Sequence, residues 1–267
     1  EHLWRVFYIN TSPSKRWKVI NTIEMIRLLK MPNPRVYIDL IDPEETPEQD
    51  LPIDPYVLGV IIGDGCISNG VVKISTPDDF ILQQIERTLP DSLEIQKLNN
   101  YDYIIKVKRK SSRNVYIHHL TQLGLMGKLS HEKTIPSQYI FGSLNQKLSL
   151  LQGLLDTDGT VGKSGSVSYN TTSPLLASCI QYLVRSIGGI ANIVERQTYF
   201  THNNIRKPGR LSYDVDIRIK NPSRLFRLDR KKSRTNDNNQ YSDILKLRVR
   251  DITPTKIDYS KCISVDH

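Results

Sequence analysis

The amino-acid sequence predicts an α+β fold made of two similar halves, each with the element order αββαββα. The first observation behind this prediction is a pair of apolar stretches that end alike, at 57–65 and 150–159. The second is that their acidic residues, Asp64 and Asp158, lie 94 residues apart, and that the helices and strands predicted between them recur in the same order afterwards. Such internal repetition indicates two equivalent halves.

Each half carries the same sequence of local signals. The first has a turn at 68–70, a short strand, a helix opened by Thr76-Pro77, two strands around a turn at Asn99-Asn100 and a helix at 115–125. The second has a turn at 162–165, a strand, a helix opened by Ser173-Pro174, a strand at 189–199, a loop, a strand at 212–220 and a helical segment at 222–228. We therefore expect antiparallel sheets that pack on helices by one face.

The two apolar stretches are predicted to be buried helices that end at an acid. Aliphatic residues recur at i, i+1, i+4 and i+5, and a glycine follows each acid, where helices often end in a left-handed turn. The carbonyl groups at a helix end repel a carboxylate. Asp64 and Asp158 make sense there if a divalent cation takes oxygens from both carboxylates and from the carbonyl groups of Gly63 and Thr157.

Small residues in both stretches predict how the helices pack. Gly59 and Gly63 are four residues apart, as are Gly153 and Thr157. Two such stripes facing each other would let the backbones approach closely and would bring the two acids together. The alternative is that both helices are plain core and the Asp-Gly pairs are ordinary helix-end turns.

The second stretch also resembles the start of an EF-hand calcium loop. Such a loop needs a third acid and then a glutamate at its twelfth position. Thr160 and Val167 stand at those places, which counts against this interpretation.

The letters VLGVIIGDG and LQGLLDTDG resemble the motif of the LAGLIDADG homing endonucleases, in the double-motif form. Both copies keep the central glycine and the final Asp-Gly, and the first departs with Ile62 where the second has Asp156. The resemblance implies a monomer with pseudo-twofold symmetry, whose two halves form a DNA-binding β-saddle. It also implies a site-specific double-strand endonuclease in which Asp64 and Asp158 hold Mg2+, with Mn2+ as a substitute, and each half cuts one strand of a long target site. Asp156 is expected to cap or pack.

A basic residue is expected near each metal, to order the water or to steady the phosphate. The segment at 124–136, GLMGKLSHEKTIP, resembles a block of the intein-borne members of the family and assigns this role to Lys133. In the second half the matching place falls in LDRKKSR, where Lys231 is our choice and Lys232 the close alternative. The alternative is that Lys133 and Lys231 are ordinary surface lysines.

Composition favours a polyanionic partner. The 267 residues carry a net charge of +9 and a pI near 9.4, and the mean hydropathy is -0.39. Basic residues alternate at 106–110, within a strand predicted at 101–110, and in the strand at 212–220, and such a face can lie along a DNA major groove. We expect DNA contacts from the following residues, with a solvated sheet face as the alternative: Lys73, Lys106, Lys108, Lys110, Arg206, Arg210, Arg218 and Lys220.

The chain lacks any apolar run that approaches a membrane span, and its start has no signal-peptide pattern. We therefore expect no membrane contact and a location in the cytoplasm of a microbial or virus-infected cell. Three widely spaced cysteines are consistent with a reducing compartment.

The domain organisation predicted is a first half at 51–145 and a second half at 146–240, flanked by terminal segments at 1–50 and 241–267. The N-terminal segment contains strands at 4–9 and 35–40, a helix at 21–30 capped by Asn21, and a Pro- and acid-rich linker at 41–55.

Both terminal segments resemble parts of an intein splicing domain, EHLWRV at the start and KCISVDH at the end. Splicing needs a nucleophile at the first residue and a terminal His-Asn pair, whereas this chain has Glu1 and His267 at its ends. We therefore expect the endonuclease region of an intein that cannot splice alone. The alternatives are a catalytically silent DNA- or RNA-binding relative, such as a maturase or regulator, and an intein fragment whose main role is protein splicing.

Overall fold

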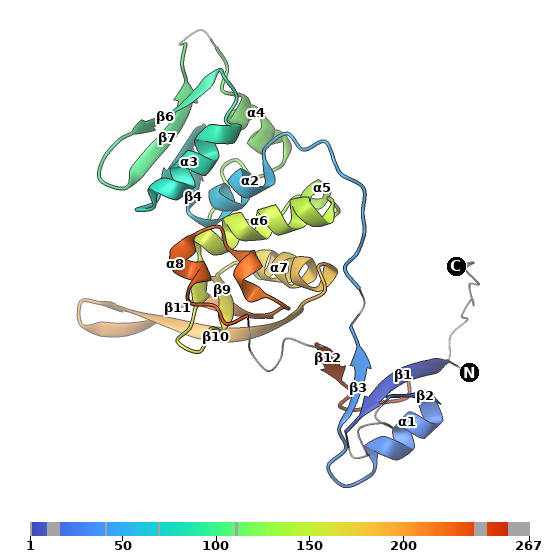
Figure 1. Cartoon of the computed structure of the whole chain (residues 1–267). Coiled ribbons are helices and arrows are strands. Elements are labelled where there is room, and N and C mark those ends of the chain that lie inside the picture. Colours follow the sequence, from blue (N-terminus) through green and yellow to red (C-terminus); the bar gives the residue numbers. More distant parts are fainter. Residues whose placement is uncertain are drawn as a thin grey trace. The chain divides into compact units, whose positions relative to one another are not determined.

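The computed structural model describes residues 2–9, 17–40, 42–68, 70–109, 112–237 and 245–255. The chain forms two compact units (Figure 1). One is Ile41–Leu245, and the other combines Glu1–Leu40 with Lys246–His267. Segments from both ends of the chain therefore fold together. Among the described residues, none of the helices has the length and apolar character needed to cross a lipid bilayer.

The smaller unit is a four-stranded antiparallel sheet with one helix. Its strands are β1 (Leu3–Tyr8), β2 (Trp17–Asn21), β3 (Val36–Asp39) and β12 (Lys246–Arg248), in the order β12-β3-β1-β2. Helix α1 (Thr22–Leu29) begins after Asn21, whose side chain accepts a 2.8 Å hydrogen bond from the N–H of Glu24. The predicted helix and its cap are confirmed, while β2 and β12 were not predicted.

The larger unit starts with helix α2 (Pro55–Gly63) and a first sheet. The elements that follow are β4 (Gly65–Ser68), β5 (Val71–Ser75), α3 (Asp79–Thr88), β6 (Leu93–Lys97), β7 (Asp102–Val107) and α4 (Val115–Gln122). The strands are antiparallel and lie in the order β4-β5-β7-β6.

A second helix and sheet complete this unit. Short α5 (Ser137–Ile140) precedes α6 (Leu144–Thr157), β8 (Gly159–Val161), β9 (Val167–Thr171), α7 (Pro174–Ser186), β10 (Ile190–His202), β11 (Ile205–Arg218), the 3-10 helix η2 (Pro222–Leu225) and α8 (Asp229–Lys232). The sheet order is β8-β9-β11-β10, which matches the order β4-β5-β7-β6 of the first sheet strand by strand. The mixed fold with antiparallel sheets is confirmed.

One predicted loop is wrong. The residues after 199 continue as strand, because β10 and β11 stay paired as far as His202 and Ile205. The turn between them is Asn203-Asn204, whose φ angles of 48° and 60° lie in the left-handed region that a tight hairpin turn requires and that asparagine tolerates. This pair of asparagines is a turn signal within the segment that was predicted to be a loop.

Helices α2 and α6 pack directly on each other through their small residues. A Cβ atom on Gly59 would collide with the carbonyl oxygen of Leu150, and one on Gly153 would collide with that of Tyr56. The backbones are therefore too close for any side chain at either glycine. This confirms the predicted packing of the two stripes.

The predicted linker is fastened to the larger unit. The N–H of Glu44 donates to the carbonyl of Ser186 at 2.8 Å, and its carboxylate accepts from the fully buried Lys147 at 2.9 Å. Further along, the side-chain oxygen of Gln146 accepts a hydrogen bond from the N–H of Gln49, and its side-chain nitrogen donates one to the carbonyl oxygen of Gln49. The segment 42–54 is thus a strap across α6 that leads into α2.

Candidate functional site

The acids predicted at the helix ends lie there. Asp64 is the residue that closes α2 and Asp158 the residue that closes α6. The glycines behind them differ from the prediction, since neither Gly65 nor Gly159 has a positive φ. Each begins a strand, and a Cβ atom there would collide with a carbonyl oxygen of the preceding helix. Glycine is therefore required at both positions because the backbone lies close to a helix carbonyl, and not because the chain makes a left-handed turn.

The two carboxyl groups influence each other. Desolvation and the charge of Asp158 raise the pKa of Asp64 to about 6. Desolvation also raises the pKa of Asp158, although Tyr169 and the two lysines Lys133 and Lys231 oppose this effect. Close packing of α2 and α6 has thus placed two like charges together, which is unfavourable unless a cation joins them.

The donor set fits Mg2+. Among the described residues, His, Cys, Asp and Glu form no group of three that could hold a metal ion. Magnesium is usually bound in proteins by one or two carboxylates, with waters and substrate phosphates completing the octahedron. Asp64 and Asp158, with carbonyl oxygens beside them, match that pattern.

Lys133 reaches the end of α2. Its side chain is 5% exposed, and Nζ donates to the carbonyl oxygens of Ile62 and Gly65 at 2.7 Å, of Gly63 at 3.2 Å and of Ile61 at 3.5 Å. The ammonium group therefore neutralises the negative end of the helix at the point where Asp64 follows.

Lys231 does the same at the end of α6. Its Nζ donates to the carbonyl oxygens of Leu155 and Gly159 at 2.7 Å, of Asp156 at 2.8 Å and of Thr157 at 3.0 Å. These are the four positions, counted from the acid, that Lys133 bonds on α2. Desolvation and the neighbouring Arg230 lower the pKa of Lys231 to about 8.

The neighbouring Lys232 points elsewhere. Its Nζ lies 3.7 Å from the carboxylate of Asp229, and its side chain is 42% exposed. Of the two lysines that the sequence left open, Lys231 is the one at the helix end.

The carbonyl groups of Gly63 and Thr157 accept hydrogen bonds from these lysines. A carbonyl oxygen has two lone pairs, so each keeps one for another ligand. Both remain candidates for metal contact.

Asp156 has a structural environment. It is 1% exposed and accepts hydrogen bonds from the Tyr56 hydroxyl at 2.8 Å and from the N–H groups of Arg227 and Leu228. It ties α6 to α2 and to the segment before α8. This confirms the expectation that Asp156 packs.

Tyr169 was not among the site residues predicted from the sequence. This residue lies on β9 opposite Gly159, and its hydroxyl donates to Asp158 at 3.3 Å. Its ring and the side chains of Lys133 and Asp158 line a cavity of about 190 Å³. A tyrosine in a strand gave no signal in the sequence.

The residues predicted to contact DNA lie on the two sheets. Lys73 on β5 and Lys106 on β7 share the exposed face of the first sheet, since Lys73 pairs with Ile104. Lys106 also bonds Glu94 at 3.1 Å. Lys108 follows the end of β7, so the strand predicted at 101–110 ends earlier than expected.

Lys110 lies outside the described residues. In the second half, Arg218 ends β11 and Lys220 follows it, both exposed. Arg206 and Arg210 lie on the outer part of β11, where the guanidinium of Arg206 is 4.2 Å from the centre of the Tyr199 ring.

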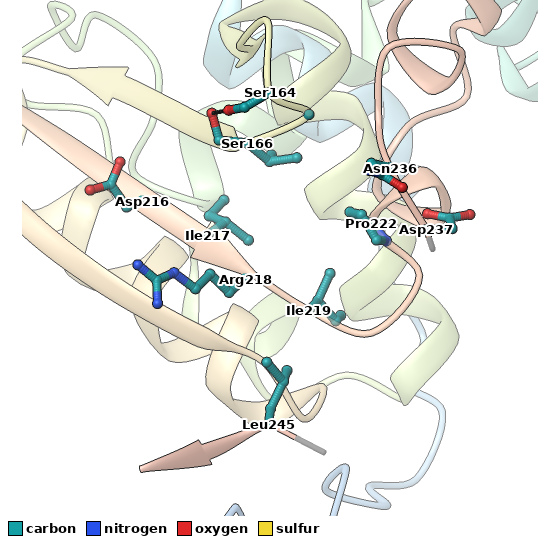
Figure 2. Close-up of a pocket in the computed structure, with 12 residues that line it drawn as sticks. Ser164, Ser166, Asp216, Ile217, Arg218, Ile219, Pro222, Asn236, Asp237 and Leu245 are labelled. Carbon is teal, nitrogen blue, oxygen red and sulfur yellow. Dashed lines mark hydrogen bonds between the residues drawn. The ribbon is translucent and has the colours of Figure 1, made fainter. Parts of the chain in front are cut away.

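A larger cavity of about 410 Å³ lies elsewhere in this unit, beside the end of β11 (Figure 2). Asp216 and Arg218 line one side of it, and Asn236 and Asp237 another. Its lining residues do not include the helix-end acids or their lysines. Residues 238–244, which connect Asp237 to Leu245 in the sequence, are outside the described part of the chain.

Comparison with known proteins identifies part of this region. Residues 145–219 match the family model described as a LAGLIDADG-like domain. The match contains α6 except its first residue, Asp158 and the whole second sheet, so the resemblance is confirmed for that part of the chain.

Several curated proteins are similar over part of their length. The chain is 29% identical over 144 residues to the replicative DNA helicase DnaB of Mycobacterium intracellulare, covering 54% of this chain and 20% of that protein. It is 28% identical over 236 residues to the ATP-dependent DNA helicase Hel308 of Thermococcus kodakarensis, covering 78% and 20%. It is 31% identical over 146 residues to the protein RecA of Mycobacterium tuberculosis, covering 49% and 18%. The chain thus spans about a fifth of the length of these relatives.

Solved structures are more distant. A structure of the homing endonuclease I-DmoI in complex with DNA and Mn superposes with a TM-score of 0.39 and 14% identity, over 62% of this chain and 89% of that one. The N-terminal LAGLIDADG domain of DUF199/WhiA superposes with a TM-score of 0.34 and 12% identity, over 63% and 75%.

Proposed function

We propose that this chain is a site-specific double-strand DNA endonuclease of the LAGLIDADG homing type, active as a monomer with pseudo-twofold symmetry. The observation that carries the proposal is the pair Asp64 and Asp158 at the adjoining ends of α2 and α6, each helix end bonded by a buried lysine. The match of residues 145–219 to a LAGLIDADG-like domain supports it.

The two acids would hold Mg2+, which Mn2+ can replace, with the carbonyl groups of Gly63 and Thr157 as further ligands. When bound, the metal would make a water molecule nucleophilic and neutralise the charge that develops on the phosphate. The chain's own contribution is to fix the acids. Rigid packing at Gly59 and Gly153 holds the helix ends together, so the carboxylates cannot drift apart to relieve their repulsion.

Lys133 and Lys231 would act beside the reacting phosphate. The Nζ atom of each lysine donates hydrogen bonds to helix-end carbonyl oxygens. The helix, and not the substrate, therefore sets the position of the ammonium group. A fixed ammonium group stabilises charge that appears later in the reaction without having to reorganise.

The duplex would lie along the exposed faces of the two sheets. Basic residues there would bind phosphates, and the strands would read base edges in the major groove. The proposed contact residues are Lys73, Lys106, Lys108, Lys110, Arg206, Arg210, Arg218 and Lys220.

An origin within an intein is part of the proposal. Segments from both ends of the chain build one compact unit, as expected if an endonuclease were inserted into a splicing domain. Three relatives with different names match over only about a fifth of their length, as expected of a module inserted into unrelated hosts. An intein fragment that serves protein splicing is the second candidate.

Selection of cleaved duplexes from a random library in Mg2+ tests the proposal. We expect one long sequence to be cut on both strands, and Asp64→Asn or Asp158→Asn to stop cleavage while binding survives. Asp229→Asn, at an exposed acid, is the matched control and should cut normally. Cutting by the double-Asn protein would refute the metal assignment. Specific binding by the intact chain without cleavage would favour a catalytically silent relative.

A further inference from the structure

The two sheets of the larger unit carry hairpins of unequal length. Strands β10 and β11 have 13 and 14 residues, whereas their counterparts β6 and β7 have 5 and 6. Each strand of the second hairpin is therefore eight residues longer. At ~3.3 Å per residue the second hairpin reaches about 26 Å farther. It runs outward past α8 in Figure 1.

The outer part of this hairpin, residues 198–210, adds nothing to the core. Tyr199, Phe200 and Ile205 are 53%, 51% and 59% exposed. The pairing register shifts between Gln197 and Tyr199. A bulge of this kind bends a ribbon and increases its twist, so it marks the place where the hairpin leaves the body of its sheet.

The charge of the outer part is of one sign. Residues 198–210 contain Arg206, Lys207 and Arg210 and no acid. Nearer the body the same strands carry Asp214 and Asp216, and Asp214 is bonded by Arg196 and Asn170. Along these two strands, the projecting part is therefore the part that carries basic residues and no acid of its own, although Glu132, outside the hairpin, lies near enough to Arg210 to interact with its charge.

We infer that residues 198–210 bind the DNA duplex beyond the reach of the β6–β7 hairpin, so that the target extends farther from the cleavage point on one side than on the other. The inference rests on the proposed endonuclease function. A two-stranded ribbon fits the major groove, the three cations match phosphates, and the exposed rings can cover apolar edges of bases. At ~3.4 Å of helix per base pair, the extra reach corresponds to at most about eight base pairs.

Shortening the hairpin tests this directly. Gln197 and Leu211 are directly paired, so Asn-Gly in place of residues 198–210 closes a hairpin with two strands of eight residues. Footprints are compared on a duplex isolated by binding selection, with Asp64→Asn and Asp158→Asn in both proteins so that the duplex stays intact. The intact chain should protect unequal lengths on the two sides. The shortened chain should lose about five base pairs at the longer end only, because the five residues removed from β10 span ~17 Å.

Two further variants keep the result interpretable. Asn204→Gly preserves the length and the turn and should leave the footprint unchanged. Gln in place of Arg206, Lys207 and Arg210 keeps the hairpin but should lower the slope of log Kd against log salt by up to about 2.7.

Equal protection on both sides, loss at both ends, or an unchanged footprint and slope would overturn the inference. So would self-association of the intact chain that disappears on shortening while the footprint stays the same. Loss of protection at one end only on shortening, in a chain that never cuts, would leave the DNA contact of residues 198–210 standing and remove only the proposed cleavage. Absence of any footprint would remove DNA binding and the inference together.

Discussion

The hydroxyl of Tyr169 donates to Oδ2 of Asp158, and the corresponding register position beside Asp64 holds Ile74, whose side chain has no hydrogen-bonding group. Tyr169 faces Gly159 across β8 and β9, just as Ile74 faces Gly65 across β4 and β5. The two acids at the proposed metal centre therefore have different hydrogen-bonding surroundings.

Tyr169→Phe should lower the affinity of the proposed Asp64–Asp158 site for Mn2+ by roughly 10- to 100-fold. This is the usual effect of losing a hydrogen bond to a carboxylate that ligates a metal. Calorimetric titration of the DNA-bound protein measures this, with strand-resolved cleavage as a second readout. One strand should slow more than the other. Tyr213→Phe, on the neighbouring strand of the same sheet, is the control. Equal slowing of both strands would indicate a general loss of packing.

Lys231→Met should lower the free energy of unfolding by about 2–4 kcal/mol, because it leaves four helix-end carbonyl groups without their buried donor. Lys232→Met changes the adjacent exposed lysine and should alter stability by less than about 0.5 kcal/mol. Urea unfolding of the metal-free proteins compares the two. Equal effects at the two positions would contradict the helix-end role of Lys231.

Replacing Asp156 or Asp158, two acids in the same turn, by asparagine should have opposite effects on the stability of the metal-free protein. Asp156→Asn places an amide against three donors and should destabilise the fold by about 1–3 kcal/mol while leaving metal affinity unchanged once the protein is folded. Asp158→Asn removes one of two repelling charges, so it should stabilise the metal-free protein and abolish metal binding. Thermal unfolding with and without Mg2+ gives both answers, and each variant is the control for the other.

The acid pair also predicts a pH dependence. A carboxyl whose pKa is about 6 in the folded protein and about 3.9 in the unfolded chain binds its proton more tightly when folded. Its contribution to the free energy of unfolding therefore falls as pH rises from 4 to 6. Because Asp64 reaches solvent, which screens the interaction, we expect a loss of only about 1 kcal/mol.

The Asp64→Asn/Asp158→Asn protein lacks both titrating groups. The difference in melting temperature between it and the natural chain should therefore widen across pH 4 to 6, and Mg2+ should narrow it again. A difference that stays constant with pH would show that the two acids do not interact.

Much of the fold was readable because its signals are local. Asn21 caps its helix by bonding the N–H three residues on, and a cap followed by an amphipathic run is visible in the sequence. Glycines at 59 and 153 were visible too, because two backbones in contact exclude every other residue.

What the sequence hid depends on pairing between distant segments. The turn at Asn203-Asn204 lies between segments without clear alternation, since the outer hairpin has no buried face to impose one. Tyr169 matters only because register sets it opposite Gly159. Strand β12 exists only because it pairs with β3, some two hundred residues earlier.

The strap at 42–54 has a consequence for how the protein is made. Its hydrogen-bond partners on α5, on α6 and between these helices come 86 to 103 residues later, and Tyr182 and Ser186 on α7, which both bond Glu44, come later still. A ribosome delivers the strap and α2 well before the surface that receives them. Contacts between residues far apart in the sequence slow folding. The strap and α2 therefore cannot form these contacts until the later residues have been synthesised. The acid at the end of α2 meets its partner only after α6 has emerged.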